Sequence, residues 1–496
     1  MSKRTSAAAG TVAAALRPED VRLSIGASFA YGFQHVLTMY GGIVAVPLII
    51  GQAAGLSPAD VGLLITACLF MGGVATVLQT VGLPFFGSQL PLVQGVSFAG
   101  VATMLAIVNG GGGLQGVFGA VIVASLIGLL ITPIFSRIIK FFPPVVTGTV
   151  ITTIGLTLMP VAAGWAMGGN AKAPGYGSMA NIGLAGLTLA IVLLLSKVGS
   201  GAISRLSILL AMIIGTVVAA AVGMADFSKI GTGPIAAFPS PFHFGLPTFQ
   251  IAGIISMVIV ILVTLVETSA DILAVSEIIG TKVDSRRLGN GLRADMVSSA
   301  VAPVFGSFTQ SAFAQNVGLV AVTGIKSRFV VSAGGIILVL LGLLPVMGRI
   351  VASVPTPVLG GAGIVLFGTV AASGIRTLST VSYKNNMNLI IVATSIGFGV
   401  IPIAAPTFYD KFPSWFSTIF HSGISSAAVM AIVLNLLFNH FKAGNPENPS
   451  VFSAGTDRQI TPEVLNCLRH GDRCEDGKLL DAEGKEIPVA TSDAGH

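Results

Sequence analysis

Long apolar runs separated by short polar loops extend over most of the chain. Runs of about 20 residues are long enough to cross a bilayer as helices, whereas membrane-barrel strands would be about half as long. The pattern therefore predicts an all-α membrane protein with fourteen transmembrane segments. We place the segments at residues 27–50, 59–81, 90–108, 114–136, 143–163, 181–199, 205–225, 250–279, 292–308, 314–325, 329–350, 356–374, 387–404 and 424–441.

The two halves of this pattern match one another. The stretch SRIIKFFPPVVTGTV, which begins at Ser136, aligns without gaps on GRIVASVPTPVLGGA, which begins at Gly348. Two short, polar runs interrupted by glycine, around Gln94 and Gln315, lie a similar distance apart. We therefore predict a 7+7 inverted repeat, because an odd number of segments gives the two repeats opposite orientations. Short or broken segments in matching positions are also typical of a transporter's binding site.

Charges in the loops support this count of segments. If the N-terminus is cytosolic, the opposite side of the membrane receives only Lys172, Lys229, Arg349 and Lys411. Leaving out either short run would reverse every later loop and destroy the bias that the positive-inside rule expects. Both short runs are therefore predicted to cross the membrane, with both termini in the cytosol. The cytosolic basic residues before the tail are then Lys3, Arg4, Arg17, Arg22, Arg137, Lys140, Lys197, Arg205, Lys282, Arg286, Arg287, Arg293, Lys326, Arg328, Arg376 and Lys384.

The composition agrees with a membrane protein. Hydrophobic residues make up 53% of the chain and charged residues 9%, with a mean hydropathy of +0.89, whereas soluble domains carry about 25% charged residues. The 62 glycines suit close helix packing in a bilayer. The net charge of +6 is spread over many loops, so we exclude nucleic acid as a partner.

The two polar ends are expected to lie in the cytosol. Residues 1–24 superficially resemble a signal peptide, but the alanine-rich stretch is only weakly apolar and charged residues follow it. Residues 444–496 are too polar to form a sizeable core and are predicted to be flexible. Cys467, His470 and Cys474 in this tail are too few and too widely spaced for a metal site. Cys68, within an apolar run, is expected to be a packing residue.

Two carboxylates lie inside the apolar run at 250–279. Glu267 and Asp271 are four residues apart, so they share one face of a helix. A charged carboxylate at bilayer depth costs at least a few kcal/mol and usually marks a transport or proton pathway. Glu267 is therefore the strongest candidate for a ligand anchor or proton carrier. The alternative is a structural carboxylate that accepts hydrogen bonds from Thr264 or Thr268.

Other polar residues within the segments are weaker candidates. Asp295 could relay protons or pair with a nearby arginine, Arg293 or Arg287, at the membrane boundary. Gln315 and Asn316 offer amide donors and acceptors that suit a planar ligand with alternating N–H and C=O edges, or they could join helices. The remaining candidates are Gly318, which permits close backbone approach, Gln94 and Ser97 in the first short run, and His35.

Several separate motifs resemble those of the nucleobase–ascorbate transporter family, and within it the bacterial uric acid and xanthine permeases. They are QHVLTMYGGIVAVPLII, FPPVVTGTVITTIGL, ETSADILAVSEIIG, GLRAD and QNVGLVAVTG, in the family's order, over about residues 25–445. The last motif, from Gln315 to Gly324, fits the family signature of Gln or Glu, Asn, any residue and Gly, followed here by Thr323.

This resemblance implies a core domain and a gate domain, with a short strand in the third and tenth segments. The core would comprise residues 25–140 and 250–352, and the gate residues 141–249 and 353–443. Substrate would bind between the two broken segments, and family members are typically proton symporters that often work as homodimers. Glu267 and Gln315 would contact the base, and Asn316 and His35 would support them. Ala314, Ser97 and Phe98 would lie beside the ring, and Asp271, Asp295 and Thr323 would assist.

The residue at position 271 bears on the substrate. Uracil-type relatives often have histidine there, so Asp271 favours the xanthine and uric acid branch, while Ser97 leaves room for the additional oxygen of uric acid. We therefore expect a proton-coupled symporter of xanthine or uric acid in a bacterial-type cytoplasmic membrane, surrounded by lipid and without a cofactor or metal. Sodium coupling and another nucleobase, such as uracil, remain alternatives. From other classes, an anion exchanger or channel and an intramembrane enzyme remain open, although no nucleophile with a base in reach is evident.

Overall fold

The computed structural model describes residues 17–135, 142–228, 230–383 and 387–440, with three short stretches at 473–475, 478–480 and 484–485. The chain divides into two compact units, Met1–Gly444 and Asn445–His496. In the second unit, β3 (Arg473–Glu475) and β4 (Lys478–Leu480) form an antiparallel hairpin within the predicted flexible tail. Two of the tail residues considered as metal ligands, Cys467 and His470, lie outside the described residues. Arg137 of the aligned repeat lies outside them as well.

The first half of the larger unit begins with a short turn, η1 (Pro18–Asp20). Serine side chains cap the first two long helices, because the hydroxyls of Ser24 and Ser57 accept hydrogen bonds from the backbone of the first helical turn. The elements that follow are α1 (Ile25–Ala53), α2 (Pro58–Val81), β1 (Gln94–Val96), η2 (Phe98–Gly100), α3 (Val101–Ile107), η3 (Val108–Gly112), α4 (Gly113–Ile131), η4 (Thr132–Ile134), α6 (Pro144–Ala166), α7 (Met179–Val198), α8 (Gly201–Arg205) and α9 (Ser207–Ala221).

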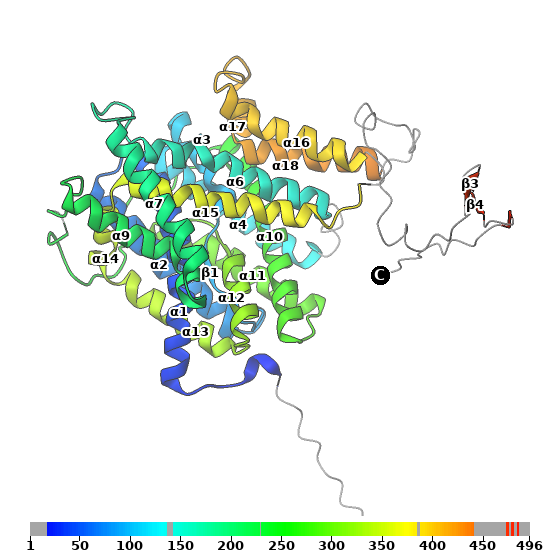
Figure 1. Cartoon of the computed structure of the whole chain (residues 1–496), viewed down its shortest axis with the longest axis horizontal. Coiled ribbons are helices and arrows are strands. Elements are labelled where there is room, and N and C mark those ends of the chain that lie inside the picture. The colour runs from blue at the N-terminus through cyan, green and yellow to red at the C-terminus, as the bar shows by residue number, and fades with distance from the viewer. Residues whose placement is uncertain are drawn as a thin grey trace, which may run out of the picture. The chain divides into compact units, whose positions relative to one another are not determined.

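The second half repeats this order of long helices, a strand and a half-helix (Figure 1). It contains α10 (Ile251–Ile279), α11 (Ser285–Val301), η6 (Ala302–Phe305), β2 (Gln310–Ala312), α12 (Ala314–Thr323), α13 (Arg328–Gly342), α14 (Pro345–Ala352), α15 (Thr356–Leu378), α16 (Met387–Ala404), α17 (Ser414–Phe420), α18 (Gly423–Asn435) and η7 (Leu436–His440). The helices α1 and α10 both have 29 residues, and α6 and α15 both have 23.

Within the described ranges, nine helices are long and apolar enough to cross a membrane. A tenth crossing is added if α13 and α14 act together, but they are bent by 81° at the break between them. The predicted single segment at 329–350 is therefore not one straight helix. Pro345 begins α14, and proline cannot continue a preceding helix because it lacks the backbone N–H.

The two predicted weak runs each contain a short strand followed by a half-helix. The strands β1 and β2 pair antiparallel, with Gln94 opposite Ala312 and Val96 opposite Gln310. One hydroxyl from a neighbouring helix bonds the backbone of each first strand residue: Thr76 of α2 accepts from the Gln94 N–H at 2.9 Å, and Ser299 of α11 accepts from the Gln310 N–H at 2.8 Å. The two halves therefore meet through equivalent strands.

This register corrects one detail of the sequence comparison. The strand pairing and the two hydroxyl anchors make Gln94 equivalent to Gln310, not to Gln315. Counting forward from the strands, Ser97 corresponds to Phe313 and Phe98 to Ala314. The two short runs named in the sequence analysis thus correspond as segments, and the strands fix which residues within them match.

Helix packing has the same internal correspondence. The helix α2 packs on α13, and its counterpart α11 packs on α4, while α6 packs on α15. In Figure 1, α6, α15, α16 and α18 run side by side in one group, and α1, α11, α12 and α13 lie in another. The half-helices α3 and α12 each follow one strand of the pair, and they leave it toward different ends of the unit.

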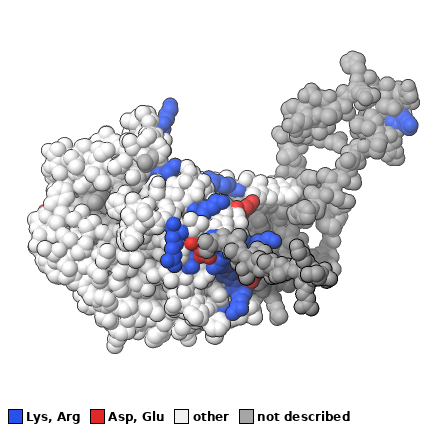
Figure 2. All heavy atoms as spheres, turned by 90° about the horizontal axis from the view of Figure 1, so that it is seen from below, with Lys and Arg blue, Asp and Glu red and all other residues white. Residues whose placement is uncertain are grey.

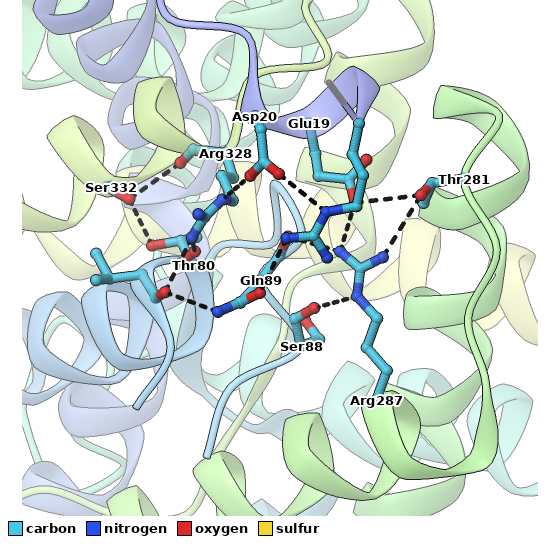
Figure 3. Close-up of polar contacts among 11 residues, drawn as sticks. Glu19, Asp20, Thr80, Ser88, Gln89, Thr281, Arg287, Arg328 and Ser332 are labelled. Atoms are coloured by element: carbon cyan, nitrogen blue, oxygen red, sulfur yellow. Dashed lines mark hydrogen bonds and ion pairs between the residues drawn. The ribbon is translucent and has the colours of Figure 1, made fainter. Parts of the chain in front are cut away.

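A charged network holds the end at which α10 and α12 terminate, which we call the α12 end (Figure 3). Glu19 of η1 is fully enclosed and accepts hydrogen bonds from Arg287 at 2.6 Å and Thr281 at 3.1 Å. Arg287 also donates to the backbone carbonyls of Ser88 and Gln89. A single acidic residue thereby joins η1 to the segment before β1 and to the start of α11.

Asp20 extends this network to α13. Its carboxylate accepts a hydrogen bond from Arg328 at 2.7 Å and from Arg17 at 2.9 Å. Arg328 in turn donates to the carbonyls of Thr80 and Val81 at the end of α2. Lys and Arg side chains gather with Asp and Glu on the face of the molecule seen in Figure 2. Residues 17–20, predicted to be part of a cytosolic lead-in, are thus packed onto the helices.

The opposite end, where α3 terminates, is held differently, and we call it the α3 end. The side-chain amide of Gln115 donates to the carbonyl of Phe244 at 2.7 Å, and the N–H of Thr248 donates to the carbonyl of Gln115 at 2.9 Å. The ring of Phe118 packs against Phe244 and Phe308, with ring centroids 6.3 and 5.8 Å away. Aromatic packing and backbone hydrogen bonds thus hold the segment that precedes α10.

Candidate functional site

A cavity of about 330 Å³ lies beside the half-helix α12. We call it the α12 cavity. The helices α1 and α12 form one wall. The other wall is formed by α15 and by the junction between α8 and α9. Of the residues predicted to bind substrate, Gln315 and Gly318 line this cavity, and the adjoining Ala314 is exposed. The full lining is Thr38, Met39, Gly42, Arg205, Ile208, Phe313, Gln315, Gly318, Leu319, Val322, Leu366 and Thr369.

Phe313 lines this cavity, and its ring packs directly against two glycines that have no room for a side chain. A methyl group at Gly42 of α1 would lie 2.7 Å from Cε1 of the ring, and one at Gly95 of β1 would lie 2.6 Å from Cε2. Phe98, predicted to lie beside the ligand ring, packs near Phe313 and Phe367 with ring centroids 6.5 and 6.0 Å away. These aromatic side chains form a cluster of tilted and edge-on rings near the beginning of both half-helices.

The predicted carboxylates lie together where α10 and α11 pack. Asp271 is buried and interacts electrostatically with both Glu267 and Asp295. Thr268 donates to Oδ2 of Asp295 at 2.7 Å and accepts from the Ala312 N–H of β2 at 3.3 Å. One threonine therefore connects a carboxylate of α11 to the strand that precedes α12.

The structural alternatives for these acids find no support. Thr264 donates to its own helix at Val260, and Thr268 donates to Asp295, so neither hydroxyl caps Glu267. The two arginines proposed as partners of Asp295 are engaged elsewhere, Arg287 with Glu19 and Arg293 with Asn290. Oδ2 of Asp271 and Oδ1 of Asp295 are buried and have no hydrogen-bond partner among the described residues.

Asn316 points away from the α12 cavity and toward α1. Its side-chain amide lies 3.1 Å from Nδ1 of His35 and donates to the His35 carbonyl at 3.0 Å. Both residues are buried. This contact favours the supporting role that the family resemblance implied for Asn316 over the direct ligand contact expected from its amide chemistry. The pair fixes the first turn of α12 on α1.

Three other predicted residues lie outside the lining of the α12 cavity. Ser97 accepts a hydrogen bond from the Ala99 N–H at 3.2 Å and so caps η2. Thr323 donates to the Leu319 carbonyl at 2.8 Å in the last turn of α12. Gln94 is fully buried in β1, and its side-chain amide has no partner within the described part of the chain. None of these three lines the α12 cavity.

A second cavity of about 690 Å³ lies beside α3, on the other side of the strand pair, and we call it the α3 cavity. Its lining comes from α3, α6 and the α16–α18 region, which correspond in the repeat to α12, α15 and the α7–α9 region. Asp410 and His421 line it, with Oδ1 and Nε2 3.5 Å apart. The two half-helices therefore each border a cavity, but the ionisable side chains in the two cavities differ.

A cluster of hydroxyl groups beside the α3 cavity joins three helices. Thr103 of α3 lies 2.8 Å from the Ser422 hydroxyl and 3.2 Å from the Ser425 hydroxyl, both at the start of α18. Ser256 of α10 lies 3.0 Å from the Ser425 hydroxyl. All four residues are buried. The cluster lies three turns before Glu267 on α10, so it closes the contact between α10, α3 and α18 on the α3 side.

Sequence reasoning missed the aromatic and basic walls of the site. Phe313 and Phe367 looked like ordinary apolar residues, and Arg205 looked like one of many loop charges. Phe313 could have been found from its place directly before the half-helix motif. No sequence signal brings Arg205 to the same cavity as Gln315, because they are 110 residues apart and meet only through helix packing.

The arrangement suits a flat, polar, uncharged or weakly acidic ligand. Gln315 supplies an amide donor and acceptor, the phenylalanines supply a stacking surface, and the nearby acids supply proton acceptors. Among the described residues, no ion pair involves Glu267, Asp271 or Asp295. No basic side chain therefore holds these three groups among the described residues, and none of the three lines the α12 cavity.

Comparison with known proteins gives this geometry a family. Residues 26–408 match the sequence model of the Permease family, Xan_ur_permease. The chain is 41% identical over 426 residues to the uric acid transporter UacT of Escherichia coli K12, a match that covers 85% of this chain and 88% of that protein. It is 38% identical over 421 residues to the xanthine permease of Bacillus subtilis 168, covering 85% and 96% respectively.

Solved structures with much lower sequence identity share the fold. The transmembrane domain of a cyanobacterium bicarbonate transporter, BicA, superposes with a TM-score of 0.54 at 14% identity, covering 84% of this chain and 99% of that domain. The murine Solute Carrier 26 family member A9 anion transporter, in its inward-facing state, gives 0.57 at 12% identity, covering 85% and 70%. With the family model and these relatives, the motif resemblance is confirmed: the chain is an integral membrane protein and belongs to the Permease family, alongside bacterial uric acid and xanthine permeases.

Proposed function

We propose that the protein is a proton-coupled symporter that imports an oxidised purine, xanthine or uric acid or both, across the cytoplasmic membrane. The names of its relatives include both substrates. The observation that carries the proposal is the half-buried Glu267, which has no ion pair among the described residues and lies in a membrane helix that packs on α12, the half-helix that carries Gln315.

The architecture that we propose has fourteen segments in a 7+7 inverted repeat. The core would contain α1–α4 and α10–α14, and the gate would contain α6–α9 and α15–α18. Equal lengths of α1 and α10, the paired strands and the matching hydroxyl anchors support this division. Short helices such as α8 with α9, and α17 with α18, would each complete one segment with their partner. We also propose a homodimer, as the family resemblance implies.

The α12 end would face the cytosol. Arg17, Arg287, Lys326 and Arg328 lie at this end, whereas the α3 end has the Gln115 amide, the Asp60–His243 pair and a single buried arginine, Arg349, among the contacts described. A concentration of basic residues on the cytosolic side is what the positive-inside rule expects. The α12 cavity would then open toward the cytosol and the α3 cavity toward the outside, and both termini would be cytosolic.

Glu267 and Gln315 would hold the polar edge of the purine, while Phe98 and Phe313 would contact its face. Asn316 and His35 would keep α12 in position. Three carboxylates within electrostatic range cannot all be charged at bilayer depth without a large cost, so at least one would carry a proton when the site is empty. Release of substrate and proton toward the cytosol would follow as the gate moves relative to the core.

The test is uptake of labelled xanthine and uric acid in cells that lack their own purine permeases, with and without a protonophore at fixed pH. We expect accumulation that the protonophore abolishes. Glu267→Gln should lower accumulation by about 100-fold or more, the range found when a group that exchanges protons is removed. Glu277→Gln, an exposed position on the same helix, serves as the matched control and should transport like the wild type.

Two results would contradict the proposal. Uptake that is indifferent to the protonophore would remove proton coupling, and wild-type accumulation by Glu267→Gln would remove the site. Uptake that does not saturate as substrate concentration rises would favour a channel over a symporter.

A further inference from the structure

Arg205 is a positive charge at the α12 cavity that the proposed mechanism does not use. It ends α8, is half-buried and lines the same cavity as Gln315. No hydrogen bond or ion pair engages its guanidinium among the described residues, unlike Arg287 and Arg328, which are held by Glu19 and Asp20. The arginine is therefore available to a ligand.

The other polar groups of the cavity leave few donors for a ligand. The hydroxyl of Thr38 donates to the Gln34 carbonyl at 2.9 Å, and that of Thr369 donates to the Leu366 carbonyl at 2.6 Å. Both threonines can then only accept a further hydrogen bond. The Gln315 amide and the Arg205 guanidinium are the lining side chains that remain able to donate.

Arg205 is the one ionisable side chain in the lining of the α12 cavity among the described residues. Glu267, Asp271 and Asp295 interact electrostatically with one another, and none of them is in the lining of the α12 cavity. The α3 cavity, which corresponds to the α12 cavity in the repeat, has Asp410 and His421 in its lining and no Lys or Arg among its described lining residues. Of the two cavities, the α12 cavity is thus the one with a permanent positive charge.

We propose that Arg205 binds the anionic form of the purine at the α12 mouth, as a second position that the substrate occupies before release. This inference rests on the proposed function, because it takes the substrate class from it. At a mildly acidic pH, uric acid is already largely ionised while xanthine is still mostly neutral. The urate ring anion lies beside a carbonyl oxygen, and a planar guanidinium fork matches two adjacent acceptors of this kind. Arg205 therefore selects uric acid over xanthine at this face.

The selection should be confined to one face of the membrane. Labelled xanthine counterflow is measured in right-side-out and inside-out vesicles, with unlabelled uric acid or xanthine as competitor, at a mildly acidic pH where only uric acid is ionised. In the vesicles that present the α12 end to the medium, Arg205→Gln should weaken competition by uric acid roughly ten-fold, the loss typical for a hydrogen bond to a charged group. Competition by xanthine should change less than about two-fold.

Two further variants separate a site from a general surface charge. Arg205→Lys keeps the charge and loses the fork, so uric acid should bind with an intermediate affinity. Lys197→Gln removes a charge at the end of α7, outside the cavity lining, and should leave both competitors unchanged. The xanthine counterflow of Arg205→Gln reports that the variant is folded and inserted; if that variant does not insert, Arg205→Lys carries the comparison.

The failures are distinguishable. The role of Arg205 is overturned by equal weakening of competition by both purines, by the same loss in Lys197→Gln, or by no change in competition by uric acid. In each of these cases, xanthine transport by the wild-type protein still upholds the proposed function. A wild-type protein that transports no purine overturns the proposed function and this inference with it.

Discussion

The α12 end and the α3 end are built by corresponding helices of the two halves, yet different interactions hold them. At the α12 end, Glu19 and Asp20 lie among arginines, and Arg287 and Arg328 each bond backbone carbonyls as well. At the α3 end, the equivalent approach to α10 is held by the Gln115 amide and the Phe118 ring. Repetition of the backbone path therefore does not require repetition of the chemistry.

The same contrast separates the two cavities. The α12 cavity has Arg205 and Gln315 in its wall, and the α3 cavity has Asp410 and His421 beside a buried hydroxyl cluster. The two half-helices therefore border cavities that present different charges.

The largest effect that we predict comes from the wall shared by the two half-helices. Gly95→Ala places a methyl group 2.6 Å from the Phe313 ring and 3.0 Å from Cε of Met39. Overpacking of this kind costs about 1–3 kcal/mol, so purine uptake should fall at least roughly ten-fold as Phe313 is displaced into the α12 cavity. Uptake by Gly183→Ala, which meets nothing within 4 Å in α7, should stay at the wild-type rate.

A second change tests the support of α12. Asn316→Ala removes the amide that contacts His35 and leaves the His35 carbonyl without this donor. Loss of a buried partner costs about 1–3 kcal/mol, so the thermal midpoint of the purified protein should fall and the substrate concentration at half-maximal uptake should rise. Unchanged stability together with lost uptake would show instead that Asn316 contacts the ligand directly.

The hydroxyl cluster should matter less. Ser425→Ala removes the group that joins Thr103 to Ser256, at a cost of about 1 kcal/mol for one neutral hydrogen bond. Because the cluster closes the contact on the α3 side, the variant should favour the state open at that side. Accessibility of a cysteine introduced at Ala106 in the α3 cavity should rise roughly five-fold, whereas a cysteine at Val322 in the α12 cavity should not become more accessible.

The smallest effect concerns the α12 end. Burial alone would raise the pKa of Asp20, but the hydrogen bonds and charges of Arg328 and Arg17 outweigh it and hold the pKa below its ordinary value. A lowered folded-state pKa gives stability that is present above the unfolded value and is lost as pH falls through the folded value. Acidification from neutral pH should therefore lower the free energy of unfolding by roughly 0.5 kcal/mol, the value for a partly solvated pair, and the thermal midpoint should fall with it.

Asp20→Asn should remove this component of the pH dependence, and Arg328→Gln should remove most of it as well, because Arg328 is the principal partner. An unchanged slope of the thermal midpoint against pH in both variants would mean that the Asp20 carboxylate does not contribute to acid sensitivity.

The sequence predicts the parts of the site that depend on local pattern. A carboxylate in an apolar run identifies Glu267, and broken segments identify β1 with α3 and β2 with α12, because both signals lie within a few adjacent residues. Contacts between distant helices could not be predicted in this way. The orientation of Asn316 toward His35, the bond from Thr268 to Asp295 and the entry of Arg205 into the α12 cavity all depend on tertiary packing.

The enclosed turn η1 also constrains the order of assembly. Glu19 meets Arg287 across 268 residues of sequence, and Asp20 meets Arg328 across 308. Synthesis proceeds from the N-terminus, so Glu19 and Asp20 leave the ribosome long before their partners Arg287 and Arg328 have been made. Closure of η1 is consequently a late event, and protection of Arg17–Asp20 from an added protease would report that both halves of a newly made molecule have come together.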